Sequence, residues 1–320
     1  MSNYASGARA DCTAPGAHER GTNMTLSDAT PPAVRDGIVR TPTTGQDLHY
    51  RDWGGSGRPI LLLHGLASSS RIWDLLAPRL RPVGRVVALD QRGHGASGKP
   101  DGGYDFATIV GDVAGAAQAL DLVRPVVIGH SWGAAVALAY AAATPACPGA
   151  ALIDGGVVDM QAQPDSGWDA VARRLAPPDL STRRVADITG FLRSGPLADL
   201  DPAFVTDFVH SLMAEQSDGT VRPRLTRARH MAILRQLWEF HPAALLPQVA
   251  CPLLVILAHA PADRATPEFD AAKRAGLAAL AGHPHVETHV LPDTLHDIPL
   301  HRPEALAALI AAWLSTLPPP

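Results

Sequence analysis

Five short runs of consecutive apolar residues constrain the fold of this chain more than any other feature of its sequence. The runs occupy residues 59–63, 86–89, 125–128, 151–153 and 253–257. A run of this length without polar alternation is typical of a strand that is buried on both faces. Stretches with helical character lie between several of the runs, at residues 72–80, 106–120 and 134–143. Alternating strands and helices of this kind favour a parallel sheet covered by helices, so we predict an α/β fold.

The remaining segments predict how the fold is divided. Residues 38–40 and 48–53 are typical of two short opening strands, residues 286–291 of a last strand and residues 303–317 of a last helix. Residues 156–242 interrupt the alternation, since they hold helical patterns at 168–175, 204–213 and 231–240 but no convincing strand. We therefore predict a core formed by residues 37–155 and 243–320, with residues 156–242 inserted as a helical cap.

Residues 1–36 lack apolar periodicity and are rich in Ser, Thr, Gly, Ala and Pro. They contain no apolar segment of the kind found in signal peptides, so we predict a disordered extension and a cytoplasmic protein. Met24 is an alternative start of translation.

Charge and composition exclude several classes of function. The net charge of −4 lacks the basic excess of a nucleic-acid-binding protein, and no apolar run is long enough to span a membrane. Three scattered cysteines predict neither a disulfide framework nor a zinc site. Residues 93–98 are rich in glycine but lack the Gly-Lys-[Ser/Thr] ending of a phosphate-binding loop. We expect a small-molecule substrate and no cofactor or metal, and the sequence leaves the oligomeric state open.

The strongest chemical signal is Gly-His-Ser-Trp-Gly at residues 129–133. It matches the pattern G-x-S-x-G, follows an apolar strand and precedes a helical stretch. A nucleophile on such a tight turn needs glycine on both sides, because neighbouring Cβ atoms would collide. The pattern predicts Ser131 as a nucleophile. An ordinary glycine-rich turn is the alternative reading.

A serine hydroxyl needs a base that is held by an acid. Of the fourteen histidines, His296 has the most suitable position, in a loop between the last strand and the last helix. We predict Asp263 as the acid, because it follows the strand at 253–257 and gives the order Ser, Asp, His along the chain. Asp154, at the end of the preceding strand, is the alternative acid. Two backbone N–H groups, on Leu66 and Trp132, are the predicted oxyanion hole.

These motifs resemble the cap-bearing branch of the α/β-hydrolase superfamily, which includes esterases, lactonases, carbon–carbon bond hydrolases and cofactor-free haloperoxidases. The resemblance covers residues 37–155 and 243–317 and rests on residues 64–67, 90–97, 129–133 and 296–299. It implies a mostly parallel sheet of eight strands, flanked by helices, and a Ser–Asp–His triad, with residues 90–97 forming a structural turn. The sequence departs from the family at residues 258–263, which lack the glycine of the usual Gly-x-x-Asp loop. Some family members place the acid after the earlier strand, where this chain has Asp154.

The resemblance also narrows the chemistry. Haloalkane dehalogenases and soluble epoxide hydrolases of this fold use an aspartate where this chain has Ser131, and hydroxynitrile lyases use a cap lysine, whereas the only lysines here are Lys99 and Lys273. The cap is rich in Phe and Met, which favours an apolar pocket roof. We therefore predict a serine hydrolase that cleaves a carboxylic ester or lactone of a largely apolar small molecule through an acyl-enzyme. The alternatives are a carbon–carbon bond hydrolase or a cofactor-free haloperoxidase with the same triad, and a non-catalytic ligand-binding protein.

Overall fold

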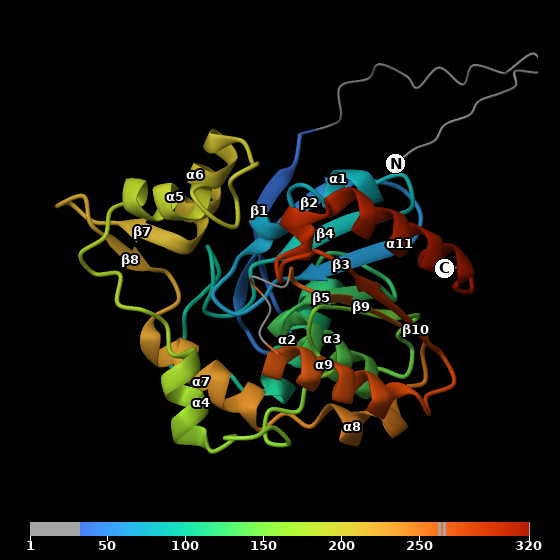
Figure 1. The fold of residues 1–320 in the computed structure, drawn as a ribbon. Helices are drawn as coiled ribbons and strands as arrows, with labels where there is room; N and C mark the ends of the chain where they lie inside the picture. Colours follow the sequence, from blue (N-terminus) through green and yellow to red (C-terminus); the bar gives the residue numbers. More distant parts are fainter. Residues whose placement is uncertain (1–32, 262–263, 265–266, 320) are drawn as a thin grey trace, which may run out of the picture. The chain divides into compact units, whose positions relative to one another are not determined.

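The computed structural model describes residues 33–261, 264 and 267–319, and these residues form one compact unit. A sheet of eight strands runs through this unit in the order β1-β2-β4-β3-β5-β6-β9-β10 (Figure 1). β1 pairs with β2 and β2 with β4 in antiparallel fashion, and all the other pairs are parallel. The strands are β1 (Arg35–Arg40), β2 (Asp47–Gly54), β3 (Pro59–Leu63), β4 (Arg85–Leu89), β5 (Val126–His130), β6 (Ala150–Ile153), β9 (Leu253–Ala258) and β10 (Val286–Leu291).

Helices cover both faces of the sheet, as the buried strands predicted (Figure 1). Along β3, Ile60 and Leu62 belong to one apolar cluster, while Leu61 and Leu63 belong to the other, because successive side chains point to opposite faces. One cluster is closed by α2 (Phe106–Ala119), α3 (Trp132–Ala143), α8 (Pro242–Leu245) and α9 (Pro267–Leu280). The other is closed by the 3-10 helix η1 (Ser70–Trp73) and by α1 (Ala77–Leu80), α10 (Ile298–His301) and α11 (Pro303–Thr316). A short 3-10 helix, η2 (Leu246–Gln248), follows α8.

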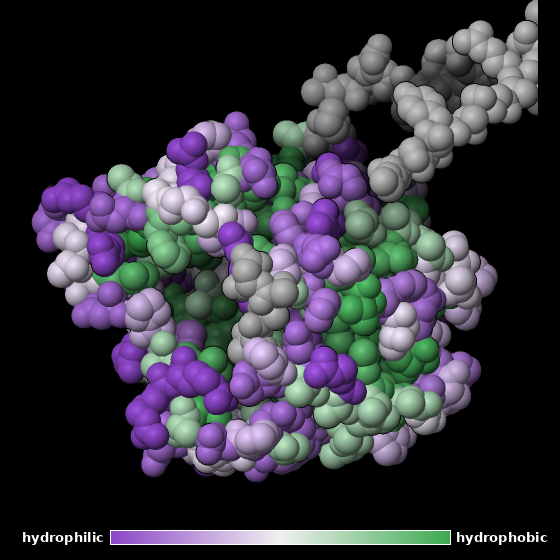
Figure 2. Space-filling view, viewed as in Figure 1, coloured by the Kyte–Doolittle hydropathy of each residue, from purple (hydrophilic) through white to green (hydrophobic). Residues whose placement is uncertain are grey.

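Residues 156–242 carry the three predicted helices, one helix that was not predicted (Val185–Arg193) and, against the expectation of no strand, a small sheet. The helices are α4 (Trp168–Leu175), α5 (Val185–Arg193), α6 (Pro202–Leu212) and α7 (Arg227–Trp238), and the antiparallel strands are β7 (Met213–Glu215) and β8 (Val221–Pro223). Phe208 of α6 and Ile233 of α7 are buried in different apolar clusters of the core. The insertion therefore packs onto the core at two places. Figure 2 shows polar side chains on its outer surface and apolar ones in the hollow between the α5–α6 and α4–α7 regions.

Two further local predictions were wrong. Residues 1–32 of the predicted extension lie outside the described residues, but its last two residues belong to β1, which begins at Arg35, and Arg35 pairs with Asp52 of β2 in the sheet and by a 2.5 Å ion pair. The helical stretch at 72–80 is not one helix but η1 followed by α1. Pro78 explains the break, since it lacks an N–H and its ring would collide with the carbonyl four residues earlier in a continuous helix. None of the helices in the described part of the chain combines the length and apolar character needed to cross a membrane.

Candidate active site

Ser131 lies on the turn between β5 and α3, in a backbone conformation that L residues rarely adopt (φ 55°, ψ −118°). Its N–H donates to Ile153 O of β6 at 2.9 Å. A Cβ on Gly129 would lie 2.0 Å from Gly133 O, and a Cβ on Gly133 would lie 2.2 Å from Leu63 O. Both flanking glycines are therefore required, as predicted, and the turn presents Ser131 at the carboxyl edge of the sheet.

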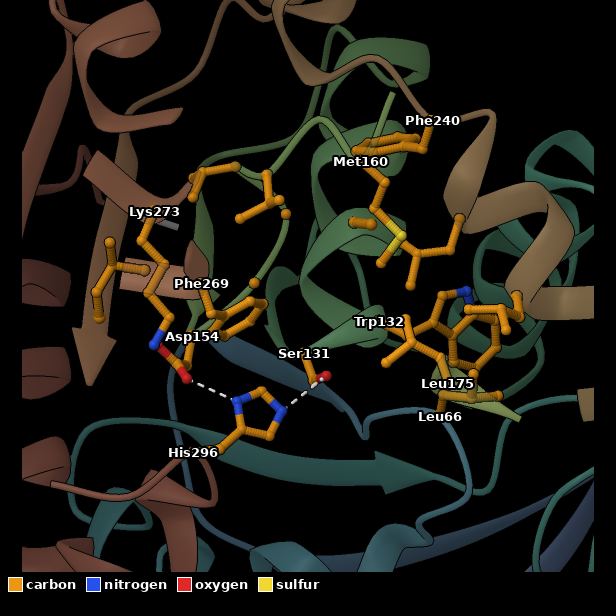
Figure 3. A pocket seen from close by; sticks show the side chains of 18 of the residues that line it. Leu66, Ser131, Trp132, Asp154, Met160, Leu175, Phe240, Phe269, Lys273 and His296 are labelled. Carbon is orange, nitrogen blue, oxygen red and sulfur yellow. Dashed lines mark hydrogen bonds and ion pairs between the residues drawn. The ribbon is translucent and has the colours of Figure 1, made fainter. Parts of the chain in front are cut away.

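His296 lies beside Ser131 in the loop between β10 and α10. Ser131 Oγ and His296 Nε2 are 3.0 Å apart, and His296 Nδ1 is 2.6 Å from Asp154 Oδ2 (Figure 3). With the proton on Nδ1, the imidazole donates to the carboxylate and Nε2 accepts from the serine hydroxyl. The arrangement can thus remove a proton from Ser131 and stabilise the imidazolium that results.

The carboxylate on His296 is Asp154, the alternative of the two predicted acids. Asp263, our first choice, lies outside the described residues, and the Nδ1 position that it was expected to fill is occupied by Asp154. The sheet order explains the outcome, because β6 is the direct neighbour of β5 and its end lies next to Ser131. Asp154 leaves β6 with φ 45°, and its N–H donates to Ile256 O of β9 at 2.8 Å.

Asp154 is buried, and its second oxygen is also fully engaged. Oδ1 accepts the N–H of Ala258 at 2.8 Å and lies 2.7 Å from Lys273 Nζ. Burial raises the pKa of Asp154, but hydrogen bonding and charge from His296 and Lys273 outweigh that effect and lower it overall. Asp154 is therefore ionised at neutral pH.

The environment raises the pKa of His296. The ring faces the cavity, where 45% of its side chain is accessible, but protein surrounds it closely enough for desolvation to lower the pKa. The hydrogen bond and charge of Asp154 and the charge of Asp297 raise it by more, while Lys273 acts against them. The neighbouring ring of His130 is buried, which lowers its pKa to about 4, and it is neutral at neutral pH.

The loop after β3 passes directly over the nucleophile. A Cβ on Gly65 would lie 3.0 Å from Ser131 Cβ, so glycine lets this backbone approach the reacting serine. Leu66 and Trp132, the two predicted oxyanion donors, both line the cavity beside Ser131. Trp132 is the first residue of α3, where backbone N–H groups have no partner within the helix. Both residues therefore lie at the cavity next to the nucleophile, where the predicted oxyanion hole would have to be.

Two buried histidines from the motifs at 64–67 and 90–97, to which the sequence assigned no role of their own, hold this loop. His64 Nδ1–H donates to Gly65 O at 2.8 Å, and His64 Nε2 accepts the N–H of Gln91 at 3.0 Å. His94 Nε2 accepts the N–H of Ala67 at 3.3 Å, and the His94 ring stacks on Trp132. Burial lowers the pKa of both rings, to about 3 for His94, which keeps them neutral and able to accept these bonds.

The turn at residues 90–97 is structural, in agreement with the prediction. Asp90 accepts the N–H of Ser70 at 2.7 Å and that of Ala96 at 2.8 Å. A Cβ on Gly95 would collide with the Asp90 carboxylate. The aspartate thus ties the turn to η1 and does not point at the reacting serine.

A cavity of about 290 Å³ opens above Ser131 (Figure 3). Its lining is mostly apolar and comes from both the core and the inserted helices. The polar side chains in the lining are Ser131, Asp154, His230, Lys273 and His296, and the larger apolar ones are Leu66, Trp132, Met160, Leu175, Leu234, Leu237, Phe240, Leu257 and Phe269.

Within the described residues, His130, His296 and Asp297 are the one group close enough together to be considered as metal ligands. Both ring nitrogens of His296 already face Ser131 and Asp154. His130 Nε2–H donates to His296 O at 2.9 Å. His296 therefore has no ring nitrogen free for a metal ion, and the other two residues alone do not make a metal centre.

The amino-acid sequence of this chain is similar to that of known hydrolases and related enzymes. The model of the alpha/beta hydrolase family matches residues 60–309. A haloalkane dehalogenase of Mesorhizobium japonicum is 36% identical over 122 residues, which are 37% of this chain and 40% of that protein. A non-heme chloroperoxidase of Streptomyces lividans is 40% identical over 104 residues, which are 32% of this chain and 38% of that protein. The matched segments span less than half of the length of these relatives.

Solved structures resemble the chain over most of its length. E-2-(acetamidomethylene)succinate hydrolase has a TM-score of 0.72 and 23% identity, covering 89% of this chain and 100% of that one. The enol-lactonase from Burkholderia xenovorans has a TM-score of 0.64 and 22% identity, covering 87% of this chain and 100% of that one. At these identities the likeness shows a common fold.

Proposed function

This chain belongs to the alpha/beta hydrolase family, and we propose that it is a serine hydrolase that cleaves a carboxylic ester or lactone through an acyl-enzyme. The observation that carries the proposal is the continuous contact from Ser131 through His296 to Asp154 at the base of an apolar cavity. Nucleophile, base and acid have the contacts that acyl transfer requires.

In the first half-reaction, His296 Nε2 takes the hydroxyl proton while Ser131 Oγ bonds to the carbonyl carbon of the ester. The N–H groups of Leu66 and Trp132 bind the oxyanion that forms. Asp154 stays ionised and stabilises the imidazolium. His296 then gives its proton to the leaving alkoxide, the carbon–oxygen bond breaks, and the alcohol departs. In a lactone this alcohol remains tethered to the acyl group.

In the second half-reaction, a water molecule replaces the alcohol. His296 takes one proton from the water while the water oxygen bonds to the acyl carbon. The Leu66 and Trp132 amides bind the second oxyanion. The proton returns to Ser131 Oγ as the acyl–serine bond breaks. The carboxylic acid leaves, and the site regains its starting protonation state.

The lining of the cavity favours a neutral, apolar substrate. Lys273 is the only lysine or arginine that lines it in the described part of the chain, and its ammonium is already paired with Asp154. A succinate carries two carboxylates, and binding them here would leave negative charges without a partner in an apolar cavity. The acetamidomethylene-succinate in the name of the structural relative is therefore poorly suited to this cavity, whereas an uncharged ester or lactone suits it well.

The decisive experiment combines an active-site label with an ester panel. A fluorophosphonate should label the wild-type protein once, at Ser131, and p-nitrophenyl esters should be hydrolysed. Ser131→Ala should abolish labelling and reduce turnover by about 10³-fold or more. Ser315→Ala changes an exposed serine on α11 and is the matched control. Near wild-type turnover by Ser131→Ala would overturn the proposal, and a wild-type protein that neither labels nor turns over esters would favour a ligand-binding role.

The alternative of cofactor-free haloperoxidase chemistry draws support from the similarity to the non-heme chloroperoxidase. Here hydrogen peroxide would replace water in the second half-reaction and release a peracid, which then oxidises bromide. Bromination of monochlorodimedone with acetate and peroxide, measured beside hydrolysis of the same acyl group, separates the two. Dehalogenation is not proposed despite the matching dehalogenase, because the family's dehalogenases use an aspartate where this chain has Ser131.

A further inference from the structure

Lys273 is a buried lysine whose ammonium lies at the active site. It is one of only two lysines in the chain and is 8% exposed, in the middle of α9. Nζ donates to Ala258 O at 2.9 Å, lies 2.7 Å from Asp154 Oδ1, and lies 4.8 Å from the centre of the Phe269 ring. Burying an ammonium costs free energy unless the charge is paired, and these partners explain how Lys273 can remain buried.

The geometry makes Asp154 a shared carboxylate. Oδ2 faces His296, while Oδ1 is held by Lys273 from one side and by the N–H of Ala258 from another (Figure 3). Three partners on two oxygens leave the carboxylate little freedom to rotate. The positive charge of Lys273 also offsets part of the negative charge of Asp154, which would otherwise act in full on the His296 imidazole.

We propose that Lys273 is a positioning residue of the hydrolytic reaction. It fixes the plane of the Asp154 carboxylate so that Oδ2 meets Nδ1 of His296, and its charge opposes protonation of that imidazole. Two of the three ammonium donors face Ala258 O and Asp154 Oδ1, and its charge is paired with Asp154, so in this proposal Lys273 acts through Asp154 and not by binding the substrate. This inference rests on the proposed function, because it concerns the same serine, base and acid.

The sign of the expected pH effect follows from the groups around His296. Asp154 from the end of β6 and Asp297 from the same loop favour the charged imidazole, and Lys273 from α9 disfavours it. His130 from β5 packs against the ring, and burial keeps it neutral. From α10, His301 accepts the N–H of Leu295 at 3.0 Å and also has a lowered pKa. Removing the Lys273 charge therefore raises the pKa of His296. As the pH falls, the imidazole is then protonated, and lost as a base, at a higher pH than in the wild-type protein.

The test is the rate of fluorophosphonate labelling as a function of pH in Lys273→Met, which keeps the apolar stem and removes the charge and the donors. We expect the maximal rate to fall roughly 10-fold to 100-fold as the carboxylate loses its fixed orientation. The midpoint of the acid limb should move to higher pH. Lys99→Met is the matched control, since Lys99 donates to Gly95 O and Ser97 O on the structural turn, and its midpoint should stay at the wild-type value.

Further variants separate charge, geometry and folding. Lys273→Arg keeps the charge and should hold the midpoint near the wild-type value even if its larger head lowers the maximal rate. Lys273→Gln keeps a donor without the charge, and it takes the place of Lys273→Met if circular dichroism shows that the methionine variant does not fold.

Three outcomes decide the inference. A midpoint that moves up in the uncharged variants and stays in Lys273→Arg supports it. An unchanged midpoint in a folded uncharged variant overturns it, and so does a loss confined to the KM of negatively charged esters, which would make Lys273 a substrate-binding residue. Absence of labelling in the wild-type protein would instead refute the proposed function.

Discussion

At the scale of single residues, the protonation of His296 sets the pH dependence of the site. The histidine must be neutral to accept the Ser131 proton, and its pKa is raised above the ordinary value of about 6.5. Because protonation removes the base, kcat/KM for a p-nitrophenyl ester should fall as the pH drops through a midpoint above that value. A profile that stays flat between about pH 5 and 8 would contradict the role of His296.

Asp154 and Asp297 both raise the pKa of His296, but only Asp154 contacts Nδ1. Asp154→Asn should lower kcat by about 10⁴-fold, since the amide favours the wrong imidazole tautomer. Asp297→Asn removes a half-exposed carboxylate whose Oδ1 is 3.8 Å from His130 Nε2, so it should move the acid midpoint downward and leave the maximal rate nearly unchanged. Equal losses in the two variants would contradict the assignment of Asp154.

The same residues show what the sequence could and could not predict. Ser131 and His296 were found because each occupies a recognisable place, a glycine-flanked turn or the loop after the last strand. For the acid the sequence favoured Asp263, whereas Asp154 contacts His296, and the residues alone could not correct that choice because both aspartates follow buried strands. The choice depends on which strand lies beside β5 and on the left-handed conformation of Asp154. Lys273 was missed as a site residue because α9 was not among the predicted helices.

At the scale of elements, the site depends on close backbone packing where β5, β6 and α3 meet. The buried strands β3, β5 and β6 could be predicted from their apolar runs, whereas the approach of Gly155 to the nucleophile could not, since it follows from the tertiary fold. A Cβ on Gly155 would lie 2.2 Å from Ser131 O, which is backbone and cannot move aside cheaply. The requirement for glycine is therefore steric at this position.

Gly155→Ala should reduce the free energy of unfolding by about 1–3 kcal/mol, the typical cost of forcing an extra methyl group into a packed site. It should also lower the labelling rate, because relief of the clash displaces Ser131. Gly167→Ala is the matched control, since a Cβ there meets nothing within 4 Å and its φ of −55° suits alanine. Urea unfolding followed by circular dichroism measures both variants, and equal stability of the two would contradict the steric account.

At the scale of the whole molecule, the catalytic groups and the substrate cavity come from different parts of the chain. Ser131, Asp154 and His296 are carried by turns at the edge of the sheet, whereas Leu175, Leu234 and Phe240 come from the inserted segment. The sequence predicted this division from the interruption of its strand–helix alternation. It could not show which of the insertion's apolar side chains face the cavity, because the same residue types also pack the insertion onto the core.

The division predicts that acyl-chain selectivity can be changed without changing the chemistry. Leu234 of α7 is 1% exposed and lines the cavity, so Leu234→Ala should deepen the cavity without touching Ser131, His296 or Asp154. The ratio of kcat/KM for a long-chain p-nitrophenyl ester to that for the acetate should rise by about 10-fold or more, because each methylene that a hydrophobic pocket accommodates is worth at least roughly that factor. Phe191→Ala, on the same inserted segment, removes a larger apolar side chain that is 71% exposed and should leave the ratio unchanged.

Leu234→Ala should also lower the thermal midpoint, since truncating a buried leucine costs about 2–5 kcal/mol, so the ratio is measured well below that midpoint. If the ratio stays constant in folded Leu234→Ala, the acyl chain does not occupy this cavity, and the apolar lining cannot be what selects the substrate.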